Sequence, residues 1–241
     1  MKTVKKLTVL LFISVVFASC GVDMFNRIDG NRNVISEKRK INDDFTRVKV
    51  SSGIDLYIKQ GNKVSLTVEA DENLHDYIMT EVQGDMLKIY VDGNIWRAKA
   101  RKVYLTVTNI EELRATSGSD VYSQGVIKAR DLDVSTSSGA DMRIEVDADN
   151  VTSSSTSGSD LRISGTSNTH STSATSGSSV HAYGLESKDV TARVSSGADI
   201  SVYASESIEA RASSGGDIRY KGNPEKVNKK SSSGGGIRSR S

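Results

Sequence analysis

The sequence has very little cysteine, proline and aromatic residue, and these scarcities exclude whole classes of protein. One cysteine, one proline and 5% aromatic residues occur in 241 positions. The single cysteine, Cys20, has no partner for an intramolecular disulfide, so the fold is not a disulfide-stapled framework. The small number of aromatic residues in a chain of this length favours one elongated domain over two globular ones.

What the sequence does have is a recurring motif of two hydroxyl residues, a glycine, a small residue, an aspartate and an apolar residue. It first reads Ser-Ser-Gly-Ile-Asp-Leu at 51–56 and returns as Thr-Ser-Gly-Ser-Asp-Val at 116–121. From Gly118 onward, the glycines of successive copies are 21, 19, 19, 20, 18 and 19 residues apart. A fixed period of this length predicts a solenoid, in which each repeat stacks on the next. The motif supplies a structural ladder of turns made of Gly53, Asp55, Gly118, Asp120, Gly139, Asp141, Gly158, Asp160, Gly197, Asp199, Gly215 and Asp217.

Residues that can be buried alternate with polar ones on both sides of each glycine. Around Gly139, the alternating positions are Leu132, Val134, Thr136, Met142, Ile144 and Val146. A period of two indicates strands with one buried face, and a rung of about 19 residues is too short for a βαβ crossover. We therefore predict an all-β fold, a narrow parallel β-helix, or solenoid. Right-handed winding is the default for parallel crossovers, although the sequence leaves a left-handed β-helix open.

The residues before the regular rungs predict a different kind of β-structure. Strand-like runs between Phe45 and Thr108 carry larger hydrophobic residues, so we expect a sandwich-like section that caps one end of the solenoid. Residues 20–40 lack alternation and are interpreted as a tether. The β-helix domain is then expected over 41–230, followed by a degenerate last rung and tail over 231–241.

The first residues have the features of a bacterial lipoprotein signal. Three lysines precede an apolar stretch over 7–17, which predicts a signal peptide over 1–19 that is too short to span a membrane. Its end, Phe-Ala-Ser-Cys, resembles a lipobox, which implies that Cys20 becomes the lipidated first residue of the mature chain. Removal of 1–19 leaves 29 basic against 30 acidic residues, a net charge of −1 that argues against a nucleic-acid partner.

The order of several loose motifs is similar to that of a known family. Phe-x-x-Val-x-Val at 45–50 is followed by Gly-x-Asp-Leu-Tyr-Ile-x-Gln-Gly at 53–61, Val-x-Leu-x-Val-Glu-Ala at 64–70 and Leu-x-Ala-x-Ser-Gly-Ser-Asp at 113–120. Over about 41–225, the chain resembles the auto-transporter adhesin head domains, also called GIN domains, of envelope lipoproteins in Bacteroides-like bacteria. The resemblance implies a β-helix-like fold and an adhesin role.

The aspartates of the ladder have two readings. Stacked carboxylates could hold Ca²⁺, because Gly-x-Asp-apolar is half of the calcium-binding nonapeptide of β-roll proteins. The period here is about 19 rather than nine residues, each rung offers one carboxylate, and Ser179 and Gly236 interrupt the row. We favour the second reading, in which each aspartate accepts hydrogen bonds from its own turn and tolerates unusual backbone angles after glycine.

Trp96 and Arg97 are the candidate ligand contacts. They lie in a basic segment, 94–102, and an exposed tryptophan among cations can stack on sugar rings or contact a membrane or an anionic glycan. The alternative is that Trp96 folds back onto the β-structure above a solvated hairpin loop. The partners that we expect are the membrane, through the lipid, and a glycan or an extracellular matrix protein.

Catalytic signatures are weak. The sequence has no Gly-x-Ser-x-Gly elbow, and its histidines are scattered, with His170 at an interior repeat position that predicts a packing role. A β-helix glycosidase would place acids in a groove, and the candidates are Asp131, Asp133, Asp147 and Asp149. Solvated charges on an outer face explain these four more simply. We therefore expect no catalytic residues, no metal and no cofactor.

Together these features predict a non-catalytic cell-envelope lipoprotein that is an adhesin or a surface-binding, structural β-helix. The alternatives are a periplasm-facing lipoprotein in envelope homeostasis or signalling, and a carbohydrate-active β-helix enzyme. Gly21 after the cysteine favours the outer membrane over retention at the inner membrane, and the sequence leaves the leaflet undecided.

Overall fold

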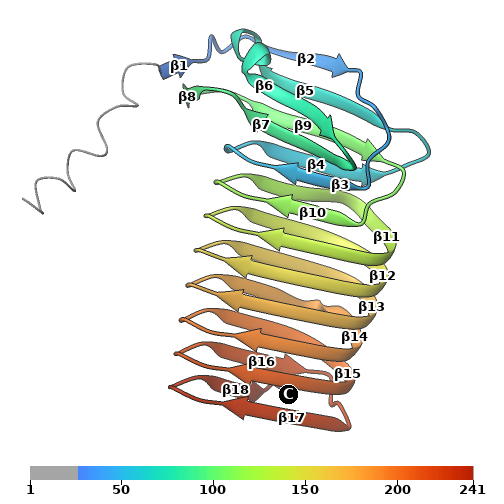
Figure 1. The fold of residues 1–241 in the computed structure, drawn as a ribbon, viewed down its shortest axis with the longest axis vertical. Coiled ribbons are helices and arrows are strands. Elements are labelled where there is room, and N and C mark those ends of the chain that lie inside the picture. Colours follow the sequence, from blue (N-terminus) through green and yellow to red (C-terminus); the bar gives the residue numbers. More distant parts are fainter. Residues whose placement is uncertain (1–26, 241) are drawn as a thin grey trace, which may run out of the picture.

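The computed structural model of the protein describes residues 27–240, and these form one β-solenoid of about seven turns with roughly 19 residues per turn (Figure 1). The strands are β1 (Arg27–Asp29), β2 (Val34–Arg39), β3 (Arg47–Val50), β4 (Asp55–Gln60), β5 (Ser65–Asp71), β6 (Ile78–Gln83), β7 (Met86–Val91), β8 (Asn94–Arg97), β9 (Arg101–Val107), β10 (Glu112–Ala115), β11 (Asp120–Thr136), β12 (Asp141–Thr156), β13 (Asp160–Thr175), β14 (Ser179–Val194), β15 (Asp199–Ala212), β16 (Asp217–Lys221), β17 (Lys226–Ser231) and β18 (Gly236–Ser239). A short 3-10 helix, η2 (Glu72–Tyr77), is the helical element among them. Within 27–240, no helix has the length and hydropathy of a membrane span.

Each long strand, β11 to β15, supplies both walls of a rung. It runs along one wall, curves at one edge of the solenoid and returns along the facing wall (Figure 1). Successive strands pair in parallel and in the predicted register, so that Asp120 lies beside Asp141, which lies beside Asp160. This register confirms the predicted parallel solenoid with its period of about 19 residues.

The interior is as narrow as the small residues predict. One buried column consists of Val121, Met142, Leu161, Val180, Ile200 and Ile218. The facing wall is partly polar, and its hydroxyls pair between rungs: Thr136 donates to Ser155 at 3.0 Å and Ser153 donates to Thr172 at 2.8 Å. Hydrogen bonding between neighbouring rungs makes these buried hydroxyl groups tolerable in the core.

At one edge, each rung turns through a tight corner at the repeated Ser-Gly. Ser138 and Gly139 both have positive φ, 53° and 70°, and the amide of Ala140 donates to the carbonyl of Ser137 at 3.2 Å. This is the type I′ geometry, which requires two left-handed residues. The Gly139 amide donates to the Ser157 carbonyl of the next corner at 3.1 Å, so neighbouring corners are hydrogen-bonded to each other along the edge.

At the opposite edge, the chain bends more gradually, and glycine is needed there for a different reason. Gly165 has a φ of 115°, and a Cβ on it would lie 1.8 Å from the Val146 carbonyl oxygen of the preceding rung. A side chain at this position would therefore collide with the backbone, whereas a Cβ on Gly139 would meet nothing within 4 Å. Close approach selects glycine at the bend, and backbone conformation selects it at the corner.

The N-terminal section continues the two walls rather than standing apart from them. β3 pairs in parallel with β10, and β4 pairs in parallel with β11, so the corner at Gly53 already belongs to the solenoid stack. Beyond them the walls end in antiparallel pairs: β6 with β7, β9 with β5, and β5 with β2. The predicted sandwich-like cap is therefore two facing walls closed by antiparallel strands, within the same sheet as the rungs.

The predicted tether is wrong over its second half. β2 is the antiparallel edge strand beside β5, and β1 pairs with β8, so residues 27–39 belong to the cap. The reason is a set of long-range polar contacts: the amide of Arg32 donates to the buried Asp71 carboxylate, and Asn73 donates to the Asp29 carbonyl. Residues 20–26, like the predicted signal peptide, lie outside the described residues.

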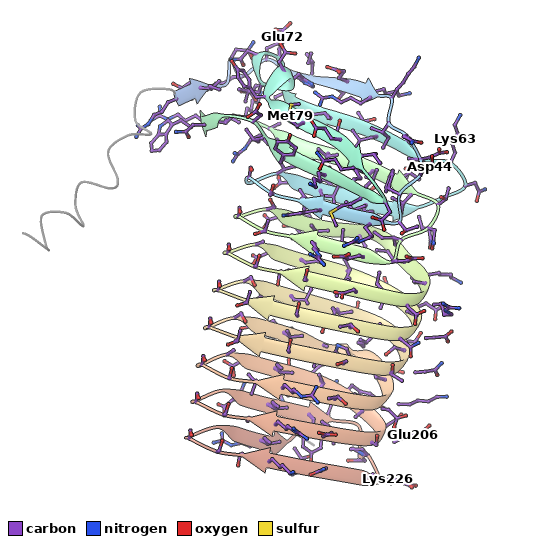
Figure 2. The ribbon with its side chains drawn as sticks, in the orientation of Figure 1. Asp44, Lys63, Glu72, Met79, Glu206 and Lys226 are labelled. Carbon is purple, nitrogen blue, oxygen red and sulfur yellow. The ribbon has the colours of Figure 1, made fainter. Side chains whose placement is uncertain are left out.

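The other end of the solenoid is open. β17 pairs with β15 and is exposed at every position, and β18 pairs with β16 after one more Ser-Gly corner at Ser233 and Gly234. Lys229 takes the register position beside the buried Ala210, and no further rung within 27–240 covers it. Figure 2 shows Lys226 at this end and Glu72 at the capped end of the molecule.

Candidate functional site

The ladder of turns forms the corner edge, with one carboxylate on most rungs. Asp55, Asp120, Asp141 and Asp160 lie in register on neighbouring strands, so consecutive carboxylates are separated by one strand spacing, about 4.8 Å. Partial burial, together with the carboxylates of Asp55 and Asp141, raises the pKa of Asp120. The row is thus a column of like charges in which neighbours oppose each other's ionisation.

The partners of these carboxylates differ from the prediction. Two of them accept hydrogen bonds from arginines: Arg162 on the same strand donates to Asp160 at 3.3 Å, and Arg219 on the next rung donates to Asp199 at 3.0 Å. The amide of each corner glycine is used by the next corner, and positive φ falls on the serine and glycine rather than on the aspartate. These two aspartates therefore pair with side chains rather than with their own turns.

No group of three or more histidine, cysteine, aspartate or glutamate side chains within the described residues is arranged to hold a metal ion. The in-register row explains this, because it places the carboxylates side by side instead of around a common point. His170, which was predicted to pack in the interior, is 1% exposed and lies 2.9 Å from the Ser153 hydroxyl. Burial lowers its pKa to about 4, so it is neutral at physiological pH.

Beside the aspartates, the positions four residues after each corner glycine form an outer row that the sequence analysis did not single out. Tyr57 and Tyr122 stack in this row with ring centres 5.4 Å apart. Tyr104 of β9, which follows no corner glycine, stacks on the other side of Tyr57 at 5.1 Å. Arg143, Arg162 and His181 continue it along the next rungs. The sequence could have revealed this row, because its positions all lie four residues after a corner glycine.

The bend edge carries a shallow hollow that spans five rungs, called here the bend-edge groove. Its lining includes Lys128, Asp147, Thr166, Glu186 and Tyr203, each from a successive strand from β11 to β15. Polar pairs cross from rung to rung within it: Thr166 donates to Asp147 at 3.0 Å, and Asn168 donates to Asp149 at 3.0 Å. Figure 2 labels Glu206 at this edge of β15. The groove therefore presents a regular series of amide, hydroxyl and carboxylate groups.

Of the four candidate acids for a glycosidase, Asp147 and Asp149 line this groove, and Asp131 and Asp133 line a neighbouring hollow. The structure gives three of them polar partners. Asp131 accepts from Arg130 and from Asn150, each at 2.8 Å, and these hydrogen bonds lower the pKa of Asp131. Asp147 and Asp149 are engaged by the neighbouring rung, and Asp133 follows Asp131 on the same strand. A glycosidase acid has a raised pKa, so the lowered pKa of Asp131 is opposite to the requirement.

Trp96 and Arg97 lie on β8 at the capped end, next to the start of the described chain. Trp96 is 53% exposed, and the guanidinium of Arg27 lies 3.9 Å from the centre of its ring. The prediction that Trp96 folds back on the β-structure is thus wrong, since the side chain is exposed on a small two-stranded sheet. Arg27 was missed because it fell in the expected tether. Cys20, the predicted lipidation site, lies outside the described residues.

Fold and sites together define a β-solenoid protein with polar, repetitive outer faces. The family model described as "Putative auto-transporter adhesin, head GIN domain" matches residues 44–224, and the chain belongs to this family. The resemblance seen in the sequence is therefore confirmed.

Solved structures share the fold at low sequence identity. A putative adhesin of Bacteroides fragilis superposes with a TM-score of 0.82 at 20% identity, covering 88% of this chain and 100% of that one. A putative lipid binding protein of Parabacteroides distasonis gives 0.74 at 23% identity, with 89% and 100% covered. A putative adhesin of Parabacteroides merdae gives 0.74 at 19% identity, with 90% and 100% covered. A search of curated proteins found no match.

Proposed function

We propose that this protein is a non-catalytic, lipid-anchored protein of the cell envelope that binds an extended polar ligand, a glycan or a matrix protein, as an adhesin does. The observation that carries the proposal is the bend-edge groove, where five rungs offer hydrogen-bonding groups at the spacing of the strands. An elongated ligand can contact several rungs at once, and many weak contacts in one molecule add up to useful affinity.

Two further features support this reading. The family description is that of an adhesin head, and Asp131, Asp147 and Asp149 accept hydrogen bonds from neighbouring rungs rather than being held ready for proton transfer. Cys20 supplies the anchor, because it is the single cysteine and follows an apolar segment with small residues before it. Several acyl chains on one cysteine hold a protein firmly in a membrane.

The first experiment is protease treatment of intact cells, followed by blotting for this protein beside a periplasmic control. Loss of the signal from unbroken cells is expected and places the solenoid outside. Protection until the outer membrane is breached contradicts the adhesin role and favours the periplasm-facing alternative. Cys20→Ala should release the full chain from membranes, and retention would contradict the lipid anchor.

The ligand is then sought with arrays of glycans and matrix proteins. Thr166→Arg with Asn168→Arg places two bulky cations in the bend-edge groove, and both positions are exposed on β13. The matched control is Ser171→Arg with Ser173→Arg, two exposed positions later on the same strand. Loss of binding in the first pair alone supports the groove, whereas equal loss in both places the ligand elsewhere.

A further inference from the structure

The capped end has a surface whose chemistry differs from that of the polar solenoid faces. β1 and β8 form a two-stranded sheet separate from the main one, with Ile28 paired to Ile95 and Asp29 to Arg97. On it lies Trp96, exposed over 53% of its surface and stacked against the Arg27 guanidinium at 3.9 Å. The single tryptophan of the chain is therefore displayed on the outside.

The opposite face of this small sheet is apolar. Ile28 alternates with Arg27 along β1 and therefore points away from the face that carries Trp96. A Cβ added to Gly93 would approach Ile28 at 3.1 Å and the ring of Tyr77 at 3.3 Å, which places these two side chains next to each other. Trp96 is thus an exposed aromatic residue among cations, a composition typical of a membrane–water interface.

Around Trp96 the charge is mainly positive. Arg97 and Lys99 are exposed and line a shallow hollow with Trp96, and Arg27 adds a third cation. Asp29 opposes them within the two-stranded sheet, whereas the Asp71 carboxylate beneath is buried and occupied by backbone amides. Arg27, Trp96, Arg97 and Lys99 are called here the Trp96 patch.

The short segment between Cys20 and Arg27 limits how far this patch can lie from the membrane. Arg27 comes seven positions after Cys20, and seven extended residues reach at most about 25 Å. A lipid at Cys20 therefore keeps the patch within that distance of the bilayer and gives it a high effective concentration there. The rungs run away from this end of the molecule (Figure 1).

We propose that the Trp96 patch lies against the anionic surface of the bilayer in which the chain is anchored. This inference rests on the lipid anchor of the proposed function. It assigns Trp96 and Arg97 to the membrane rather than to the ligand, because Arg27 already covers one face of the indole that a sugar would stack on. Each Lys or Arg at such a surface adds attraction that salt screens.

The test uses the chain from Gly21, which carries no acyl group and retains every described residue. It is mixed with vesicles of phosphatidylglycerol and phosphatidylcholine, or of phosphatidylcholine alone, and the fluorescence of Trp96 is recorded with co-sedimentation. A blue shift and sedimentation with the anionic vesicles, both reduced by salt, are expected. Arg27→Glu with Arg97→Glu should weaken binding roughly tenfold or more. The matched control, Lys226→Glu with Lys230→Glu at the open end, should bind as the parent does.

Three outcomes would overturn the inference: no shift with anionic vesicles, equal weakening by the control pair, or an equal shift with a soluble anionic polysaccharide. The last would make the patch a glycan site. Because the test chain lacks Cys20, a failure here leaves the lipid anchor standing. That anchor fails separately, if the Cys20→Ala full chain stays in membranes.

Discussion

The cap and the regular rungs bury their interiors in different ways. The cap, from β2 to β9, closes with antiparallel strands whose inward residues are large, such as Leu66, Ile78 and Leu105. The rungs from β11 to β15 bury alanine, serine and threonine beside aliphatic residues such as Met142 and Ile200, and one wall contains a buried histidine. A rung needs less apolar volume, because the rungs above and below cover it and satisfy its hydrogen bonds.

This difference indicates where a substitution should destabilise the protein most. Stability of stacked repeats spreads over many similar interfaces, so one rung tolerates a poor residue. The cap has no such redundancy, because its strands are joined by contacts between distant segments. Asp71 is the centre of these contacts: its carboxylate accepts from the amides of Arg32 and Lys99, each at 2.9 Å, and of Ala100 at 3.1 Å.

The largest effect is expected for Asp71→Ala. The change leaves the buried amide of Ala100 and the partly buried amides of Arg32 and Lys99 without an acceptor, and an unsatisfied buried group costs about 1–3 kcal/mol, so we expect roughly 3–4 kcal/mol of destabilisation. Urea unfolding followed by Trp96 fluorescence should move to lower denaturant, while the circular dichroism of the rungs follows later. Asp43→Ala, at an exposed position, is the control. Coincident transitions at the wild-type midpoint would show that the cap does not depend on Asp71.

The rungs should lose stability in acid because of the buried His170. Burial lowers the pKa of His170 from 6.5 to about 4, so between these values the unfolded chain binds a proton that the folded chain does not. The free energy of unfolding therefore falls as the pH falls from 6.5 to 4, by about 3 kcal/mol from this residue. In His170→Val, which matches the neighbouring Val151 and Val190, this loss should disappear.

The measurement is urea unfolding of both proteins at pH 7 and pH 4.5. Ser171→Val, at the exposed position beside His170, is the control and should leave the acid sensitivity of the parent unchanged. Equal acid sensitivity in His170→Val and the parent would show that carboxylates, not the buried histidine, govern the response.

The cap and the rungs also differ in how well the sequence predicts their structure. Alternation around Gly139 and the spacing of the glycines are local, repeated signals, and they predicted the strands, the corners and the interior position of His170. The cap could not be predicted in this way, because β1 is three residues long and the paired residues of β2 and β5 are 27 to 37 positions apart in the sequence. Of the bend-edge groove, the sequence analysis named Asp147 and Asp149 alone, since the groove is lined by short segments of five rungs that share no common motif.

The smallest effect concerns a single corner, where the rungs are most alike. Gly139→Ala puts a Cβ into open space but forces an L-residue to a φ of 70°, which costs about 1 kcal/mol. Ser138→Ala is the matched control, because Ser138 already has a φ of 53° and no new strain arises. Thermal unfolding of the two variants should differ by a few degrees. If Gly139→Ala were as stable as the control, the positive φ of this corner would not be the reason for its glycine. Because the corners of the regular rungs are alike, we expect the same loss of stability when the change is made at another corner, and Gly158→Ala tests this.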